Sequence, residues 1–377
     1  MIEKIQKRLW SIRKRVEKRK KVRQLKQNNK KYDLSTIPVW KLPENSDRSA
    51  LLVNKLDFYT IFDERVDLNN VNWHKDYVSG FEYPVKRFDK IKISRWYDKG
   101  IDIKFPWEVS RFYFAVPFAQ NYTATVDERY YIRFRDLVQD WIKKNPFLYG
   151  VNWHCTMEVS IRAVNWIVAM NLFGERFERD EEFYRSLVTS LQQHAGYIDA
   201  FPEIKPDGTA NNHLIADYFG LLFLAVTLRD HPEADKWLLT STEGLEQCIQ
   251  TQVNDDGTSF EGSIPYHRLV LEMFGYAAIL CRTNNIELSA SYYERIFTMF
   301  EFTAAYMDQN GNAPQIGDND SGRTIIFHQS DEHDHSYLLD LGEHLFNYRF
   351  LSQCEKRNNE YVFWLPEIEK INVNIEG

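Results

Sequence analysis

The chain has few cysteines and no long apolar run. Its 377 residues include four cysteines, Cys155, Cys248, Cys281 and Cys354, which lie far apart and share no spacing typical of a metal or redox motif. We therefore expect reduced thiols rather than a disulfide framework. No apolar segment follows the charged N-terminus, so we expect neither a secretory signal nor a membrane span. On the sequence alone, a cytoplasmic location is expected.

Strands that alternate with helices are also missing from the long middle of the chain. Their absence excludes a doubly wound sheet and predicts a mainly α fold. Paired helices with short connections can form a bundle, a solenoid or a closed toroid, and periodicity does not choose among them. The apolar spacing predicts helices at about Glu108–Asn121, Asp127–Lys144, Cys155–Leu172, Glu181–Phe201, Leu214–Leu228, Ala234–Val253, Pro265–Asn284 and Ala290–Met307.

Positive charge is concentrated in the first 31 residues. This segment holds 14 Lys and Arg against Glu3 and Glu17, a net charge of +12, so the remainder carries −19 of the chain's total of −7. Three interpretations stay open: a solvated arm, a basic amphipathic helix on an anionic membrane surface, and a nucleic-acid-binding segment. We expect the arm to lie outside the fold, so that its removal leaves stability almost unchanged.

Two polar stretches stand at the starts of predicted helices. Residues 209–217 read Thr-Ala-Asn-Asn-His-Leu-Ile-Ala-Asp, and residues 261–268 read Glu-Gly-Ser-Ile-Pro-Tyr-His-Arg. A helix N-terminus offers unpaired N–H groups and a partial positive charge, which suit an anion. The ordinary structural interpretation is that Asn211 or Asn212 caps its helix and that Tyr266 packs with its hydroxyl in water.

Together with three other segments, these stretches resemble a known family. Pro106–Phe112, Gly150–Trp166, the two polar stretches and Gly317–Arg323 occur in the order found in heparinase II/III and alginate-lyase-type polysaccharide lyases. The resemblance spans roughly residues 100 to 325 and implies an incomplete (α/α) toroid whose loops converge on a cleft. Family members from polysaccharide gene clusters also begin with a basic arm, so no nucleic-acid partner is expected.

The predicted organisation has four parts. They are a basic N-terminal arm (1–31), an irregular wrapping extension (32–100), the α/α toroid (101–310) and a C-terminal segment that starts a β region (311–377). In the last part the Gly-Asp-Asn-Asp-Ser-Gly-Arg run is expected to be a tight turn rather than a calcium loop, and His328, His333 and His335 a mobile polar loop. Its predicted strands are Thr324–His328, Tyr361–Leu365 and Ile371–Ile375.

The resemblance implies β-elimination at a uronic acid by a carbon–oxygen lyase, without a cofactor or a metal. The substrate carboxylate must be neutralised before the C5 proton becomes acidic, a role that the family pattern gives to Asn212 and His213. Tyr266 would carry the proton, which asks for a shifted phenol pKa, and His267 is a further catalytic candidate. The substrate-binding residues implied in the same way are Trp107, Arg111, Asn152, Trp153, Asn211 and Arg268.

The substrate follows from the same resemblance as an anionic polysaccharide. An overall negative protein needs a local basic patch to hold it, for which Arg111, Arg162 and Arg268 are candidates. In the family a further histidine often comes from a C-terminal β-sandwich, and this chain ends about where that domain would begin. His267 could substitute, a separate β-domain partner could supply it, or the protein could bind polysaccharide without turnover.

Two further expectations concern chemistry and location. A glycoside hydrolase on the same architecture would need two carboxylates beside the bond, for which Asp217, Asp256, Glu261 and Asp318 are candidates. Family habit would give a periplasmic location, in contrast to the cytoplasmic one expected from the sequence alone.

Overall fold

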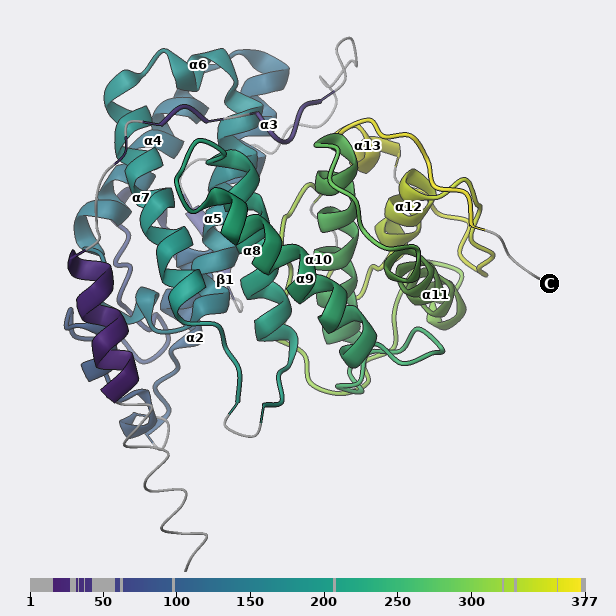
Figure 1. Cartoon of the computed structure of the whole chain (residues 1–377), viewed down its shortest axis with the longest axis horizontal. Coiled ribbons are helices and arrows are strands. Elements are labelled where there is room, and N and C mark those ends of the chain that lie inside the picture. The colour runs from purple at the N-terminus through teal and green to yellow at the C-terminus, as the bar shows by residue number, and fades with distance from the viewer. Residues whose placement is uncertain are drawn as a thin grey trace, which may run out of the picture.

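The computed structural model describes most of the chain and is predominantly helical (Figure 1). The described residues are 16–27, 32, 34–36, 38–42, 58–61, 64–96, 99–205, 208–320, 322–328, 331–357 and 359–373. The helices are α2 (Lys104–Ser110), α3 (Ala115–Thr125), α4 (Glu128–Lys144), α5 (Thr156–Phe173), α6 (Glu175–Glu178), α7 (Glu181–Ala200), α8 (Asn212–Thr227), α9 (Ala234–Gln252), α10 (Ile264–Thr283), α11 (Ala290–Tyr306), α12 (Ser336–Leu345) and α13 (Asn359–Val362).

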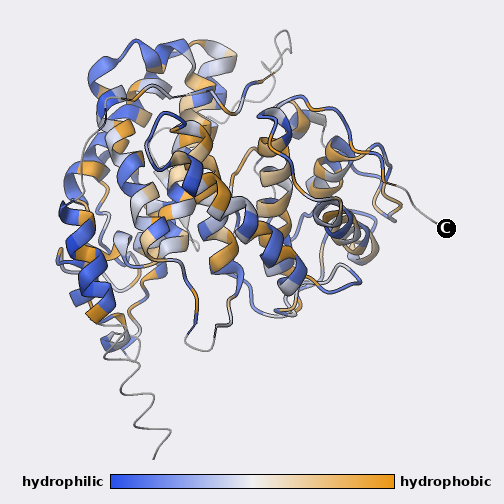
Figure 2. Ribbon diagram, in the orientation of Figure 1, coloured by the Kyte–Doolittle hydropathy of each residue, from blue (hydrophilic) through white to orange (hydrophobic). Residues whose placement is uncertain are grey.

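The helices form two rows, and burial distinguishes them. Helices α5, α8 and α10 are buried on nearly every side, and α8 packs against both α5 and α10. Helices α4, α7, α9 and α11 bury one face only, and their outer faces are polar in Figure 2. An inner row of apolar helices backed by an outer row of amphipathic ones is the architecture of the predicted incomplete (α/α) toroid, so the mainly α prediction is confirmed.

Small residues let the inner helices approach closely. Gly220 of α8 lies against Ser160 of α5, and a Cβ at position 220 would stand 2.4 Å from the Ser160 Cβ. That distance is far inside van der Waals contact, so only glycine allows these two helices their present separation. The starts of both helices are thereby held at the same end of the inner row.

The predicted helix Glu108–Asn121 is divided into two. Phe112 has a φ of 59°, in the left-handed region, and ends the run between α2 and α3. Its ring stacks on Trp73 at 5.1 Å between centroids and meets Trp166 edge-on, so aromatic packing holds the unusual backbone. The break fixes the direction of the neighbouring Arg111, which belongs to the candidate site.

The C-terminal segment differs from the prediction of strands. Thr324–His328 is irregular, Tyr361 begins the second half of the short helix α13, and Ile371 makes one isolated bridge to Phe346; residues 374 and 375 lie outside the described part. The prediction of a mobile polar loop is also wrong for His335, which is buried and immediately precedes α12. The described strands are β1 (Phe58–Ile61) and β2 (Glu64–Asp67), an antiparallel pair within the extension.

The wrapping extension is anchored in the core. Trp40 is buried, stacks on Phe327 and donates its indole N–H to the Trp364 carbonyl at 3.0 Å. Short 3-10 helices lie in the irregular parts, among them Leu68–Asn70, Phe88–Lys90, Ile93–Arg95 and Val151–Trp153. None of the helices in the described ranges has the length and apolarity needed to cross a membrane.

The described part of the basic arm packs on the domain, which corrects the expectation that it lies outside the fold. Residues 16–27 are helical, Val22 is only 1% exposed and belongs to the main core. Lys21 donates to the Ala200 carbonyl at 2.8 Å, at the end of α7. Val22 of this helix therefore faces the toroid, while residues 1–15 and 28–31 lie outside the described residues.

This contact predicts an asymmetric effect of mutations in the arm. Val22→Ala should lower the free energy of unfolding by about 1–3 kcal/mol, because it removes buried methyl groups from a packed contact. Val16→Ala is the matched control, since Val16 is 60% exposed on the same helix. Urea unfolding midpoints check this, and equal, small effects of the two substitutions would show that the arm does not dock.

Candidate active site

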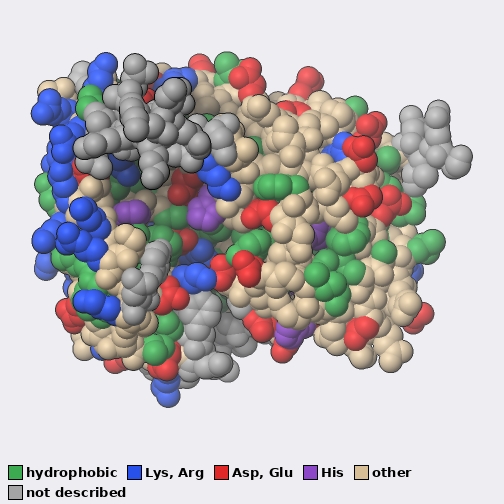
Figure 3. Space-filling view, turned by 90° about the horizontal axis from the view of Figure 1, so that it is seen from below, with side chains coloured by type: hydrophobic (Ala, Val, Ile, Leu, Met, Phe, Trp, Pro, Cys, Tyr) green, Lys and Arg blue, Asp and Glu red, His purple; other side chains and the backbone are tan. Residues whose placement is uncertain are grey.

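A pocket of about 140 Å³ opens where the starts of α8 and α10 meet α2 and the start of α5. On the face of the molecule shown in Figure 3, acidic, basic and histidine side chains meet near the middle. The pocket brings together six of the residues predicted from the sequence, which come from segments as far apart as α2 and α10. These six are Trp107, Arg111, Asn211, Asn212, His213 and Tyr266.

The start of α8 already holds a carboxylate. Asn212 donates to Glu261 through its backbone N–H at 3.0 Å and through Nδ2 at 2.9 and 3.1 Å. The structure differs from the prediction that the side chain of Asn211 or Asn212 caps this helix. Within the described structure the Asn211 side chain makes no capping hydrogen bond, and Asn212 is already the first helical residue. Glu261 thus occupies the anion position that a helix N-terminus offers.

His213 lies one residue further into α8 and pairs with a different acid. Its Nδ1 is 3.1 Å from Glu203 Oε2, an oxygen that also accepts from the Met157 backbone N–H at 3.0 Å. Burial alone would lower the pKa of His213, but the hydrogen bond and charge of Glu203 outweigh it and raise that pKa above its ordinary value. The imidazole is therefore biased toward its protonated, positively charged form.

Tyr266 contributes its hydroxyl from the first turn of α10. The hydroxyl donates to Asp320 Oδ2 at 2.9 Å, and the other oxygen of Asp320 pairs with Lys104 of α2. Burial, followed by the hydrogen bond and charge of Asp320, raises the pKa of Tyr266 well above 10.0. Tyr266 is thus held as a neutral phenol that can donate a proton.

The glycine-rich run sets the position of Asp320. Gly317 has a φ of 78°, and a Cβ there would stand 2.7 Å from the Cα of Ser263, the N-cap of α10. Ser263 Oγ donates to the Asp318 carbonyl at 2.6 Å and so ties the run to the helix. The described part of the run has a bend at Gly317 and is otherwise irregular, and residue 321 lies outside the described residues, so the predicted tight turn stays a prediction. Asp320 of this run also lines the pocket, a role that its sequence pattern does not indicate.

Arg111 is held between two glutamates. It binds Glu158 of α5 through two hydrogen bonds of 2.6 and 2.7 Å and also pairs with Glu108 one turn earlier in α2. Burial raises the pKa of Glu108 to about 7, although the neighbouring Arg111 opposes this. Glu108 can therefore exchange a proton with substrate or solvent near neutral pH.

The expected basic patch is not formed. Lys104 and Arg111 supply two positive charges to the pocket lining, whereas Glu108, Glu158, Glu261 and Asp320 are acidic. Arg162 is fully buried, with its guanidinium 4.1 Å from the Trp141 ring, and Arg268 is 1% exposed and donates to the Glu332 carbonyl. An anion in this pocket would therefore meet hydrogen-bond donors and protonated groups rather than an excess of cations.

The remaining predicted residues support the scaffold. His267 is 1% exposed and turns from Tyr266 toward α11, where its Nε2 lies 3.0 Å from Thr303 Oγ1. Consecutive residues of a helix point about 100° apart, so Tyr266 and His267 do not face the same pocket. Asn152 and Trp153 are buried and bond to Asn145. The assignments of His267, Asn152, Trp153 and Arg268 to the cleft are therefore not supported by the geometry.

The carboxylates proposed for a hydrolase do not converge. All four lie in the described part of the chain, and of them only Glu261 lines the pocket. Asp217 is fully buried and accepts from the Glu203 backbone N–H at 2.7 Å, whereas Asp256 and Asp318 are exposed. The hydrolase interpretation loses its predicted acid pair.

Comparison with known proteins places this site in a family. A family model described as Heparinase II/III N-terminus matches residues 9–335. The chain belongs to this heparinase II/III family. The match begins within the basic arm and ends just before α12, so it covers the helical region that builds the pocket.

Relatives within the family share modest identity. The chain is 25% identical over 252 residues to a heparin-sulfate lyase of Pedobacter heparinus, covering 62% of this chain and 37% of that protein. It is 23% identical over 233 residues to a heparin-sulfate lyase of Bacteroides thetaiotaomicron, covering 60% and 32%. The chain spans about a third of the length of these curated relatives.

A solved structure agrees with the fold. The crystal structure of heparinase III superposes with a TM-score of 0.53 at 17% identity, over 76% of this chain and 43% of that chain. This similarity confirms the toroid architecture.

The unusual pKa of Glu108 predicts a pH-dependent stability. Its folded-state pKa of about 7 exceeds the ordinary value of 4.5, so between these values the folded chain binds a proton that the unfolded chain has lost. The stabilisation by this proton is fully present below the ordinary pKa of 4.5, and it is lost as the pH rises through the folded-state pKa of about 7. Relative to Glu108→Gln, the wild-type chain should lose on the order of 2 kcal/mol across this range.

Urea unfolding at several pH values measures this difference. The exposed Glu287→Gln, changed in the same way, sets the background for losing one glutamate. A difference between wild type and Glu108→Gln that does not vary with pH would contradict the raised pKa.

Proposed function

We propose that this protein is a polysaccharide lyase that cleaves a uronic-acid-containing polysaccharide by β-elimination. The observation that carries the proposal is the convergence of Asn212, His213 and Tyr266 in one pocket with Trp107 at its edge. Family membership and the names of the heparin-sulfate lyase relatives support the same reaction class. Elimination breaks the C5–H bond and the bond between C4 and the glycosidic oxygen. Glu108, which lines the pocket and has a pKa of about 7, is assigned to accept the C5 proton. The C5–H electron pair forms the C4–C5 double bond and the departing oxygen takes a proton, without consuming water.

Neutralisation of the substrate carboxylate is assigned to the start of α8. Asn212 offers Nδ2 and its backbone N–H, and the raised pKa of His213 favours an imidazolium beside them. Such donors stabilise the negative charge that develops on the carboxylate when the C5 proton leaves. Because both Asn212 donors now hold Glu261, the substrate carboxylate must take the place of the Glu261 carboxylate.

Tyr266 is assigned the proton donor to the departing glycosidic oxygen. Its raised pKa keeps the phenol protonated, and its hydrogen bond to Asp320 holds the hydroxyl within the pocket. An acid role matches this electrostatic setting, whereas a base role would require the phenolate beside a carboxylate. Trp107 fits the role of a stacking surface for a sugar ring, since it is partly exposed and its indole N–H is fixed by the Val151 carbonyl at 3.0 Å.

The test combines a panel of anionic polysaccharides with Tyr266→Phe. Wild-type protein should generate the ultraviolet absorbance of the conjugated double bond on at least one uronate. Tyr266→Phe keeps the ring, so turnover should fall by about 10² to 10⁴-fold while the free energy of unfolding changes by about 1 kcal/mol or less. Substrate affinity should hardly change, because the hydroxyl acts in the transition state.

Controls separate catalysis from packing and from binding alone. Tyr293→Phe removes a hydroxyl on α11, away from the pocket, and should leave turnover unchanged. Asn212→Ala should reduce both turnover and affinity, because it removes a carboxylate donor. Binding of a uronate without any new absorbance from the wild-type chain would instead favour the non-catalytic polysaccharide-binding interpretation.

A further inference from the structure

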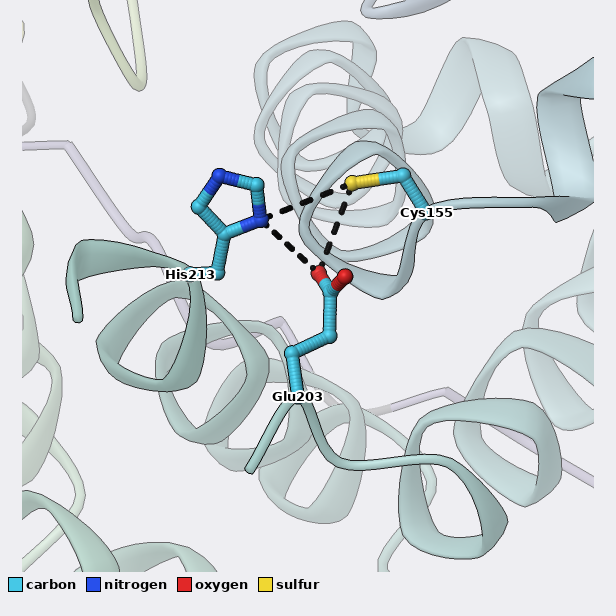
Figure 4. Close-up of side chains that lie close together, drawn as sticks. All are labelled: Cys155, Glu203 and His213. Carbon is cyan, nitrogen blue, oxygen red and sulfur yellow. Dashed lines mark hydrogen bonds and ion pairs between the residues drawn. The ribbon is translucent and has the colours of Figure 1, made fainter. Parts of the chain in front are cut away.

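Three side chains with different metal-binding atoms converge beneath the pocket. Cys155 is the residue before α5, Glu203 follows α7, and His213 lies in the first turn of α8. The Cys155 Sγ is 3.4 Å from Glu203 Oε2 and 3.7 Å from His213 Nδ1, and the latter two atoms are 3.1 Å apart. Figure 4 shows the three atoms facing one another, with the other ring nitrogen of His213 directed away from them.

These separations match one face of a tetrahedron around a small cation. Bond lengths to zinc of about 2.3 Å for sulfur and about 2.0–2.2 Å for nitrogen and oxygen give tetrahedral edges of about 3.6 Å to sulfur and about 3.4 Å between nitrogen and oxygen. The observed edges depart from these values by no more than about 0.3 Å. Small side-chain rotations would therefore bring all three atoms to bonding distance.

The chemistry of the three groups selects a particular class of ion. Thiolate and imidazole ligands favour zinc and related transition metals over calcium and magnesium, which prefer oxygen ligands only. A thiolate and a carboxylate carry two negative charges, so a divalent cation leaves the cluster neutral in a buried setting. No fourth protein ligand joins the group among the residues that the structure describes.

We propose that Cys155, Glu203 and His213 form a zinc-binding site with an open fourth position. The His213 and Glu203 side chains are 37% and 30% exposed, so water or another small ligand can reach the ion. Three protein ligands with one exchangeable position is the arrangement of catalytic rather than structural zinc sites. The ion would bind Nδ1 of His213 in place of its proton and leave the Nε2–H available as a hydrogen-bond donor. This metal-bound form is an alternative to the imidazolium form of the metal-free chain.

The sequence alone gives no signal of this cluster. The three residues are separated by 48 and 10 positions, whereas metal motifs are recognised by short, regular spacing. Only the close approach of α5 and α8, together with the turn after α7, makes them neighbours.

The experiment uses the full chain, freed of metal with a chelator and titrated with Co²⁺ and then Zn²⁺. We expect one Co²⁺ per chain, with the near-ultraviolet absorbance of a cobalt–thiolate bond, and displacement of Co²⁺ by an equimolar amount of Zn²⁺. Cys155→Ser should abolish that absorbance and weaken Zn²⁺ binding at least about tenfold, since even outer ligand contacts have effects of 10–100-fold.

Matched variants keep the test independent of folding and of activity. Cys248→Ser changes another buried cysteine, on α9, and should keep both absorbance and affinity. Glu203→Gln should weaken binding while retaining the cobalt–thiolate band, which a variant that failed to fold would lose. Substoichiometric uptake, or equal affinity of wild type and Cys155→Ser, would overturn the zinc proposal, whereas the lyase proposal is judged by its own absorbance assay.

Discussion

The hydrogen bonds between Asn212 and Glu261 are the contact on which the site depends. They join the first residue of α8 to the turn that leads into α10, so the two helix starts that carry His213 and Tyr266 are held in one place. The close contact of Gly220 with Ser160 fixes α8 against α5, which brings Glu158 and its partner Arg111 to the same end. A carboxylate at a helix N-terminus is favourable in itself, and here it fills a position suited to a substrate anion.

The pocket is consequently balanced in charge rather than strongly basic. Arg111 lies between two glutamates, Lys104 pairs with Asp320, and the pKa of Glu108 is raised to about 7 by burial. Protonation removes the negative charge of Glu108 and gives His213 a positive charge. Both changes would favour the binding of an anion in the pocket. In the proposed lyase reaction the substrate carboxylate would replace Glu261 at Asn212, so substrate entry would be coupled to the release of Glu261.

Much of the fold could be predicted from local patterns. The bounds of α4, α7, α9 and α11 follow their apolar stripes to within about one residue, because an outer helix repeats its buried face every 3.6 residues. The break at Phe112 could not be predicted, since aromatic packing by distant Trp73 and Trp166 holds its left-handed backbone. The short apolar run at Tyr361 predicts a strand but forms part of α13, because such short runs do not distinguish a strand from a helix.

The candidate site also contains both residues that the sequence predicts and contacts that it does not. Asn212, His213 and Tyr266 could be found because each lies in a family motif at a helix start. His267 could not be separated from Tyr266 without the helix orientation, which turns it toward Thr303. Lys104 and Asp320 are 216 positions apart, and Glu203 pairs with His213 across a loop, so neither contact leaves a local signal. These contacts form only because the folded chain brings segments that are distant in the sequence together.

The most direct measurement is a crystal structure of Tyr266→Phe with a bound uronate oligosaccharide from a polysaccharide that the wild-type chain cleaves. The account predicts the substrate carboxylate within hydrogen-bond distance of Asn212 Nδ2, with the Glu261 carboxylate displaced and the glycosidic oxygen facing position 266. A sugar bound elsewhere, or a carboxylate remote from α8 while Glu261 keeps both hydrogen bonds, would contradict it.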